Sequence, residues 1–68
     1  MERNLQLDWP SLVSEAIRRR KQQRLTQKDL ALAAGVSKPT IVKFENQGNI
    51  TLHAAFAILQ TLGLLKQN

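Results

Sequence analysis

At the centre of this sequence, in residues 26–46, a glycine separates two short segments of helical periodicity. Thr26 is a candidate N-cap, and Asp29 stands three residues later at the position of a capping-box acid. The predicted inner residues of the first helix are Leu30, Ala33 and Ala34. Gly35 fits the left-handed position just past a helix end. The pattern predicts two short helices joined by a tight turn, and this unit constrains how the rest of the chain can pack.

The second of these helices has a proline in its first turn. Either Ser37 or Lys38 can provide its N-cap, and Ile41 and Phe44 are its predicted inner residues. The first four N–H groups of a helix have no intrahelical acceptor, so Pro39 gives up no helical hydrogen bond and its fixed φ suits the geometry. The proline is therefore compatible with a helix start.

Two longer helices are predicted on either side of this pair. Pro10 suits a first helical position, and apolar residues then recur at spacings of three and four up to about Gln23. Thr51 is the N-cap candidate of a last helix, which Gly63 ends. The chain is therefore predicted to contain four helices joined by connections of a few residues.

The sequence predicts one all-α domain, a small bundle of about four to five helices over residues 10–65. Residues 1–9 are a predicted N-terminal arm, either flexible or, since its apolar residues alternate with polar ones, a short strand. Residues 66–68 are a predicted tail. A domain of this size buries only about 60% of the surface of its unfolded chain, so a partner surface is expected.

The composition restricts the kind of chemistry. Ten Lys and Arg against five Asp and Glu give a net charge of +5, and the isoelectric point is near 10.5, which favours a polyanionic partner. With no cysteine and a single histidine, no metal site and no cofactor is expected. The sequence has no nucleophile–base set and no phosphate-binding loop, so we do not expect an enzyme. No apolar run reaches the roughly 18 residues of a membrane span, and we expect a soluble cytoplasmic protein.

A helix, a short turn with glycine and a second helix form the helix-turn-helix, whose second helix enters the DNA major groove. Residues 26–46 match this plan. The predicted base contacts lie on the outward side of the second helix and are Ser37, Lys38, Pro39, Thr40 and Lys43. Lysine can donate to guanine, and a proline ring can pack on a thymine methyl. The alternatives are that Pro39 only starts the helix and that the lysines belong to a solvated surface.

The stretch "LTQKDLALAAGVSKPTIVKFENQGN" resembles the Cro/C1-type (Xre) helix-turn-helix family. That family has Thr-Gln before the first helix of the motif, Leu-Ala within it, Gly-Val-Ser in the turn, and Ile and Glu in the second helix. The resemblance covers about residues 12–65 and implies a lambda-repressor-like DNA-binding domain. It also implies a phosphate contact by Gln27 and a structural ion pair between Arg20 and Glu45. Further candidates for DNA backbone contacts are Lys28, Asn46 and Gln47.

The last predicted helix is apolar over much of its surface, because residues 51–65 contain no charged side chain apart from any protonation of His53. Such a helix is usually buried on more than one side. Its predicted main apolar side is Leu52, Phe56, Leu59 and Leu62. We expect a homodimer with two-fold symmetry, matching a palindromic operator. The predicted dimer interface is Phe56, Ile58, Leu59, Leu62, Leu64 and Leu65. The alternative is that this helix is only the core helix of the bundle.

Within the family, the stretch "PTIVKFENQGNITLHAAFAILQTLGL" is similar to the HipB-type antitoxins. This resemblance implies a dimeric, nucleoid-associated transcriptional repressor that binds a double-stranded DNA operator, autoregulates its operon and holds a HipA-like Ser/Thr kinase toxin. Two alternatives remain open. One is a phage-type repressor with no toxin partner, and the other is a protein-interaction module whose basic surface binds an acidic protein.

Overall fold

The computed structural model describes residues 8–65, and the predictions for residues 1–7 and 66–68 lie outside this range. The described residues form helices and no strand. The helices are α1 (Trp9–Gln22), α2 (Gln27–Ala34), α3 (Lys38–Glu45) and α4 (Leu52–Thr61). The prediction of a small all-α bundle is confirmed.

Helix α1 begins at Trp9, one residue before the start that Pro10 indicates. The Asp8 carboxylate caps the helix, because it accepts a hydrogen bond from the Ser11 N–H at 2.8 Å. This bond lowers the pKa of the Asp8 carboxyl group. The sequence pattern assigns Trp9 to the arm, but its ring packs edge-on against Phe44 with the ring centroids 5.5 Å apart. Capping by Asp8 and packing of the half-buried indole on Phe44 therefore fix the start of α1.

Helix α2 begins with the predicted capping box. The Thr26 hydroxyl accepts from the Asp29 N–H at 2.9 Å, and the Asp29 carboxylate accepts from the Thr26 N–H at 3.0 Å. The helix ends at Gly35, whose φ of +74° is the left-handed conformation expected there. The predicted inner position of Ala33 is wrong, since Ala33 is exposed and Ala31 is buried. Because α2 packs against both α3 and α4, its buried side extends to residue 31.

Helix α3 is capped by Ser37, whose hydroxyl accepts from the Thr40 N–H at 3.3 Å. Pro39 is the second helical residue, where its missing N–H costs no intrahelical hydrogen bond. Ile41 and Phe44 are both 0% exposed and hold the inner side of the helix in the core. The opposite side of α3 is thereby turned outward.

Helix α4 is rotated differently from the sequence expectation. Ile58, Leu59 and Leu62 are 0%, 5% and 1% exposed, because the core of the same chain encloses them. These three predicted dimer-interface residues therefore have almost no side-chain surface that a second copy could contact. Leu52 and Phe56 lie on the outer side instead, where they are 69% and 48% exposed.

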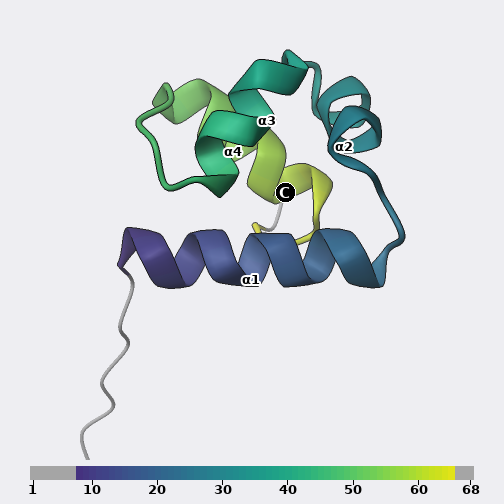
Figure 1. The fold of residues 1–68 in the computed structure, drawn as a ribbon, viewed down its shortest axis with the longest axis horizontal. Coiled ribbons are helices and arrows are strands. Elements are labelled where there is room, and N and C mark those ends of the chain that lie inside the picture. Colours follow the sequence, from purple (N-terminus) through teal and green to yellow (C-terminus); the bar gives the residue numbers. More distant parts are fainter. Residues whose placement is uncertain (1–7, 66–68) are drawn as a thin grey trace, which may run out of the picture.

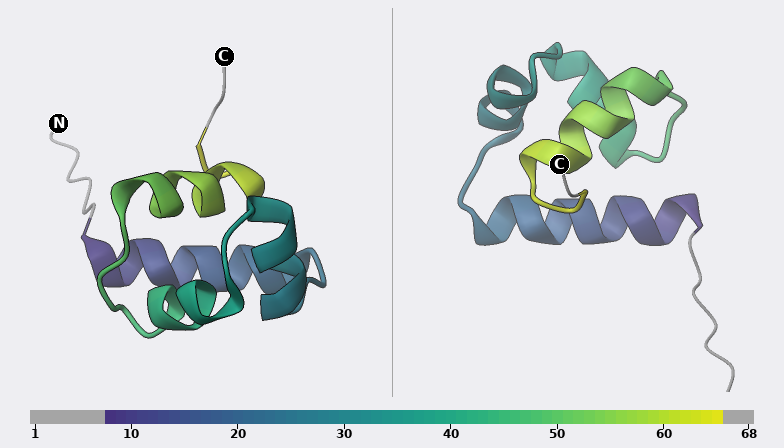
Figure 2. Two further views of the ribbon diagram at one scale, coloured as in Figure 1. Left: turned by 90° about the horizontal axis from the view of Figure 1, so that it is seen from above. Right: turned by 180° about the vertical axis from the view of Figure 1, so that it is seen from behind.

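The four helices form two layers. Helix α1 runs along one side of the molecule, and the three shorter helices cover it (Figure 1). Helix α3 lies in front in Figure 1, whereas α4 comes to the front when the molecule is turned by 180° (Figure 2). The core between them consists of Val13, Ala16, Leu30, Ala31, Ile41, Phe44, Ile58, Leu59 and Leu62. Helices α3 and α4 therefore present their outer surfaces on opposite flanks.

Candidate nucleic-acid interface

The outward side of α3 is the first candidate surface. Ser37, Lys38 and Pro39 are exposed at its N-terminus, and Lys43 is exposed near its other end. Thr40 is half-buried between them, and its hydroxyl lies 2.9 Å from the Ser37 hydroxyl. The structure thus gathers the five predicted base-contact residues on one short helix and its cap.

The lysines of this surface have no acidic partners within the part of the chain that the structure describes. The ion pairs among residues 8–65 involve Arg18, Arg19 and Arg20, and none involves Lys28, Lys38 or Lys43. Their ammonium groups can therefore donate hydrogen bonds to an external anion without breaking an ion pair between described residues. A surface of this kind suits the phosphates and base edges of DNA.

The basic run of α1, in contrast, mostly serves the fold. Arg18 pairs with Glu15 at 2.6 Å on the same helix, which lowers the pKa of that carboxyl group. Arg19 donates to the Leu62 carbonyl at 3.2 Å and thereby ties α1 to the end of α4. Arg18 and Arg19 therefore contact other groups of the chain, whereas Lys21 and Arg24 of the same run are exposed and form no ion pair among the described residues.

Arg20 and Glu45 form the centre of a hydrogen-bonded network that orients α3. Arg20 Nε donates to Glu45 Oε2 at 2.7 Å, and the two side chains are only 11% and 9% exposed. Arg20 also donates to the Leu25 carbonyl at 2.7 Å, and Gln27 Nε2 donates to Glu45 Oε1 at 3.0 Å. One carboxylate therefore joins the end of α3 to α1 and to the start of α2.

Gln27 is placed by this network beside the end of α3. Its side-chain amide N–H is engaged with Glu45, so the predicted phosphate contact has to come from its backbone N–H or from the remaining atoms of the amide. Lys28 follows it on the exposed side of α2. The predicted backbone-contact residues Asn46 and Gln47 are exposed in the turn after α3, where Gln47 has a φ of +64°.

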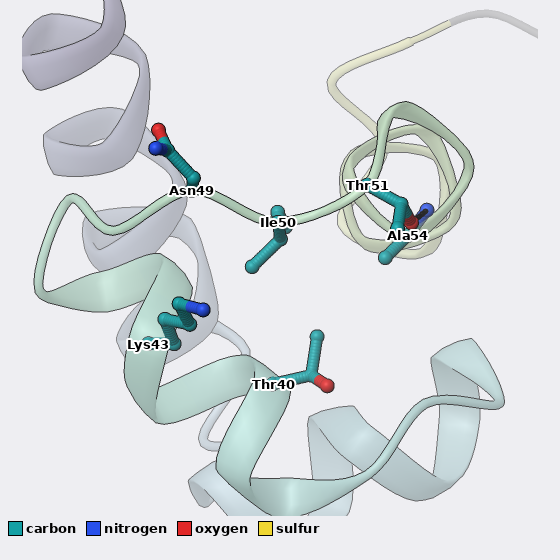
Figure 3. Close-up of a pocket in the computed structure, with 6 residues that line it drawn as sticks. All are labelled: Thr40, Lys43, Asn49, Ile50, Thr51 and Ala54. Atoms are coloured by element: carbon teal, nitrogen blue, oxygen red, sulfur yellow. Dashed lines mark hydrogen bonds between the residues drawn. The ribbon is translucent and has the colours of Figure 1, made fainter.

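An open hollow of about 400 Å³ lies between α3 and the segment that leads into α4 (Figure 3). Its lining residues are Thr40, Lys43, Asn49, Ile50, Thr51 and Ala54. Lys43 provides the cation, and the threonines and Asn49 provide neutral polar groups. Sequence patterns give no signal that Asn49, Ile50 or Thr51 belongs to the site, since only the path of the loop after α3 brings them beside Lys43.

These features define a helix-turn-helix DNA-binding domain, because a network fixes α3 on its inner side while hydroxyl, proline and lysine side chains face outward. The sequence model of the helix-turn-helix family matches residues 17–65. The chain therefore belongs to the Cro/C1-type helix-turn-helix family and is a DNA-binding transcription regulator. Comparison with curated proteins gave no match.

Within residues 8–65, no group of three or more His, Asp or Glu side chains is arranged to hold a metal ion. In the same part of the chain, no helix has both the length and the apolar character needed to cross a membrane.

Proposed function

We propose that this regulator is a sequence-specific transcriptional repressor that inserts α3 into the major groove of an operator and occludes a promoter. The observation that carries the proposal is the two-sided character of α3. Its inner residues Ile41 and Phe44 are fully buried, while Lys38 and Lys43 face outward without acidic partners among the described residues. A helix held this firmly can present the same side chains to each base pair, as specific recognition requires.

Individual roles follow from the chemistry of the outward residues. Lys38 and Lys43 donate to guanine O6 and N7 or to nearby phosphates, and the ring of Pro39 packs on a thymine methyl. Ser37 and Thr40 share a hydrogen bond of 2.9 Å, and either hydroxyl can turn to a base or a phosphate when DNA replaces this bond. Gln27, Lys28, Asn46 and Gln47 contact the DNA backbone and set the depth of α3 in the groove.

The repressor acts as a homodimer through the outer side of α4. Leu52 and Phe56 are one helical turn apart, so they form a continuous apolar strip, and both are exposed. Residues 51–65 bring no formal charge to this surface apart from any protonation of His53. The half-buried Leu64 and Leu65 extend the apolar surface beyond the helix end. Two copies bind half-sites about 34 Å apart on an inverted repeat.

The operon of this repressor also encodes a HipA-like Ser/Thr kinase toxin, which the dimer holds and with which it autoregulates transcription. The support for this part is the resemblance of residues 39–64 to HipB-type antitoxins. Co-expression of the chain with the product of a neighbouring kinase-like gene is expected to give a complex on size exclusion and to relieve growth arrest. Growth arrest that persists despite co-expression would leave a phage-type repressor without a toxin partner.

The test of DNA recognition is a titration against duplex DNA from the upstream region of the gene and against a scrambled duplex of equal length. We expect a preference for the upstream duplex of about 10³-fold or more, within the range of specific regulators. Equal affinities for the two duplexes with a steep salt dependence would mean that the basic surface binds DNA without reading its sequence. That result would favour the alternative of an acidic protein partner.

A further inference from the structure

Gly48 lies in the turn between α3 and α4, and its backbone conformation does not require glycine. The described glycines with positive φ are Gly35 and Gly63, at +74° and +79°. Gly48 is outside this group, so an L-residue can adopt its φ without left-handed strain. Its N–H donates to the Lys43 carbonyl at 2.8 Å, a bond that most other residues can make equally well. Something other than the turn geometry therefore limits this position.

The Lys43 side chain occupies the space that a Cβ atom at position 48 would need. An ideal Cβ built on Gly48 lies 2.6 Å from Lys43 Cγ, 3.5 Å from Lys43 Cε and 3.0 Å from the Lys43 carbonyl oxygen. The first of these distances is far below van der Waals contact, so the stem of the lysine has to move if position 48 carries a side chain. In the structure, this stem passes directly over the bare Cα of Gly48.

The course of the stem decides where the charge of Lys43 is available. The Lys43 side chain lines the hollow together with Thr40, Ile50 and Thr51 (Figure 3). No carboxylate among the described residues pairs with its ammonium group. The packing of the stem on Gly48 is therefore one contact that restrains this lysine on the outward side of α3.

We propose that Gly48 is a positioning residue for DNA recognition, which holds the Lys43 ammonium group on the course that meets the DNA. A free lysine loses considerable rotamer entropy when it is immobilised in a complex. Packing on Gly48 removes part of this loss before DNA arrives. The inference rests on the proposed contact of Lys43 with DNA and adds a second residue, in a different segment, to the determinants of affinity.

The test is a double-mutant cycle with Gly48→Ala and Lys43→Ala, measured on a duplex that the wild-type protein enriches from a random-sequence pool. Lys43→Ala is expected to weaken binding by about 10-fold, as for one charge-assisted contact. Gly48→Ala is expected to weaken it by about 3-fold to 10-fold through the freed side chain. In the Lys43→Ala background, Gly48→Ala is expected to change the affinity by less than about 2-fold, because the Cγ and Cε atoms are gone and the 3.0 Å approach to the residue-43 carbonyl oxygen is common to both backgrounds.

Gly35→Ala is the matched control. It also replaces a glycine with alanine, but the new Cβ atom has no other atom within 4 Å. The substitution acts instead through the φ of +74° at position 35, which alanine adopts only with strain. We expect it to lower the melting temperature and to show no coupling with Lys43→Ala in DNA affinity. All variants are compared at a temperature where circular dichroism shows them folded.

The outcomes separate the two proposals. If Lys43→Ala leaves DNA affinity unchanged, the proposed DNA contact of Lys43 is wrong. If Lys43→Ala weakens binding but Gly48→Ala has no effect, or has the same effect in both backgrounds, the positioning role of Gly48 is overturned. The contact can also be measured in the wild-type protein. We expect nuclear Overhauser contacts between the Gly48 α-protons and the Lys43 γ-protons, and their absence would also overturn the inference.

Discussion

Helices α3 and α4 begin in the same way but present different surfaces. Ser37 and Thr51 are extended N-caps whose hydroxyls accept from the N–H three residues later. Each helix also buries apolar residues in the shared core. On the outer sides, α3 has Lys38 and Lys43, whereas α4 has Leu52 and Phe56. Local capping and core packing therefore place both helices, and the outward residues alone distinguish a surface for a polyanion from a surface for a protein.

Helices α3 and α4 lie on opposite sides of the molecule when it is seen from above (Figure 2). This separation has a consequence for mutagenesis, because changes on one outer side leave the other outer side and the core in place. Effects on DNA affinity and on self-association can then be measured separately.

Removal of the carboxylate that fixes α3 is expected to have the largest effect. Glu45→Ala leaves Arg20 largely buried without its ion-pair partner, and loss of one member of a buried pair costs about 3–5 kcal/mol. Urea denaturation is the measurement. Glu15→Ala, which removes an exposed pair with Arg18, is the control and is expected to leave the midpoint nearly unchanged. Equal midpoints for the two variants would contradict the anchoring role of Glu45.

The combined variant Lys38→Ala and Lys43→Ala removes both outward lysines of α3 and tests whether this side of the helix binds DNA. We expect DNA affinity to fall by about 100-fold, since each lysine makes a charge-assisted contact of about tenfold. The melting temperature and the self-association are expected to stay unchanged, because both side chains are exposed. The double variant Lys21→Ala and Arg24→Ala also removes two exposed cations without ion-pair partners among the described residues, and it is the matched control for the loss of charge. A comparable loss of affinity in the control would assign binding to overall charge.

On the α4 side, Phe56→Ser is expected to raise the dimer dissociation constant by about tenfold or more, because apolar anchors dominate most interfaces. Sedimentation velocity over a concentration series measures it. Leu32→Ser removes a more exposed apolar side chain, 73% against 48%, from α2 and is expected to have no such effect. Unaltered association of the Phe56 variant would move the dimer interface away from α4.

The smallest effect concerns acid sensitivity. The Thr26 N–H and hydroxyl stabilise the charged Asp29 carboxylate, so the pKa of Asp29 is lowered in the folded state. This contribution to stability is present at neutral pH, above the unfolded pKa, and is lost as the pH falls through the folded pKa. We expect Asp29→Asn to be less stable than wild type at pH 7, with the difference shrinking towards pH 2. If the difference in stability stays constant over this pH range, protonation of Asp29 does not control the acid sensitivity of the fold.

The parts of this structure that sequence patterns predict are those fixed by short-range rules. Thr26, Ser37 and Thr51 cap helices where the spacing of polar and apolar residues indicates, and Gly35 adopts the left-handed turn. The buried pair Ile41 and Phe44 follows from helical periodicity, because the rest of α3 is polar enough to show a contrast.

The orientation of α4 was not predictable in this way. A helix that is apolar on nearly every side has no sequence contrast to fix its rotation, so Ile58 and Leu59 were indistinguishable from Leu52 and Phe56. Packing against α2 and the rest of the core decides which of these side chains are buried. The same applies to Gly48, because its contact with Lys43 depends on how the turn folds back over α3.

A selection of duplexes from a random-sequence pool, performed in parallel with the wild-type protein and with Lys38→Ala, shows directly whether the outward side of α3 recognises bases. If outward residues of α3 contact bases, the wild-type protein selects an inverted repeat, and the variant selects the same repeat with relaxed preference at one position of each half-site. If both proteins select the same motif with equal stringency, or no motif at all, the central claim that this side of α3 recognises sequence is contradicted.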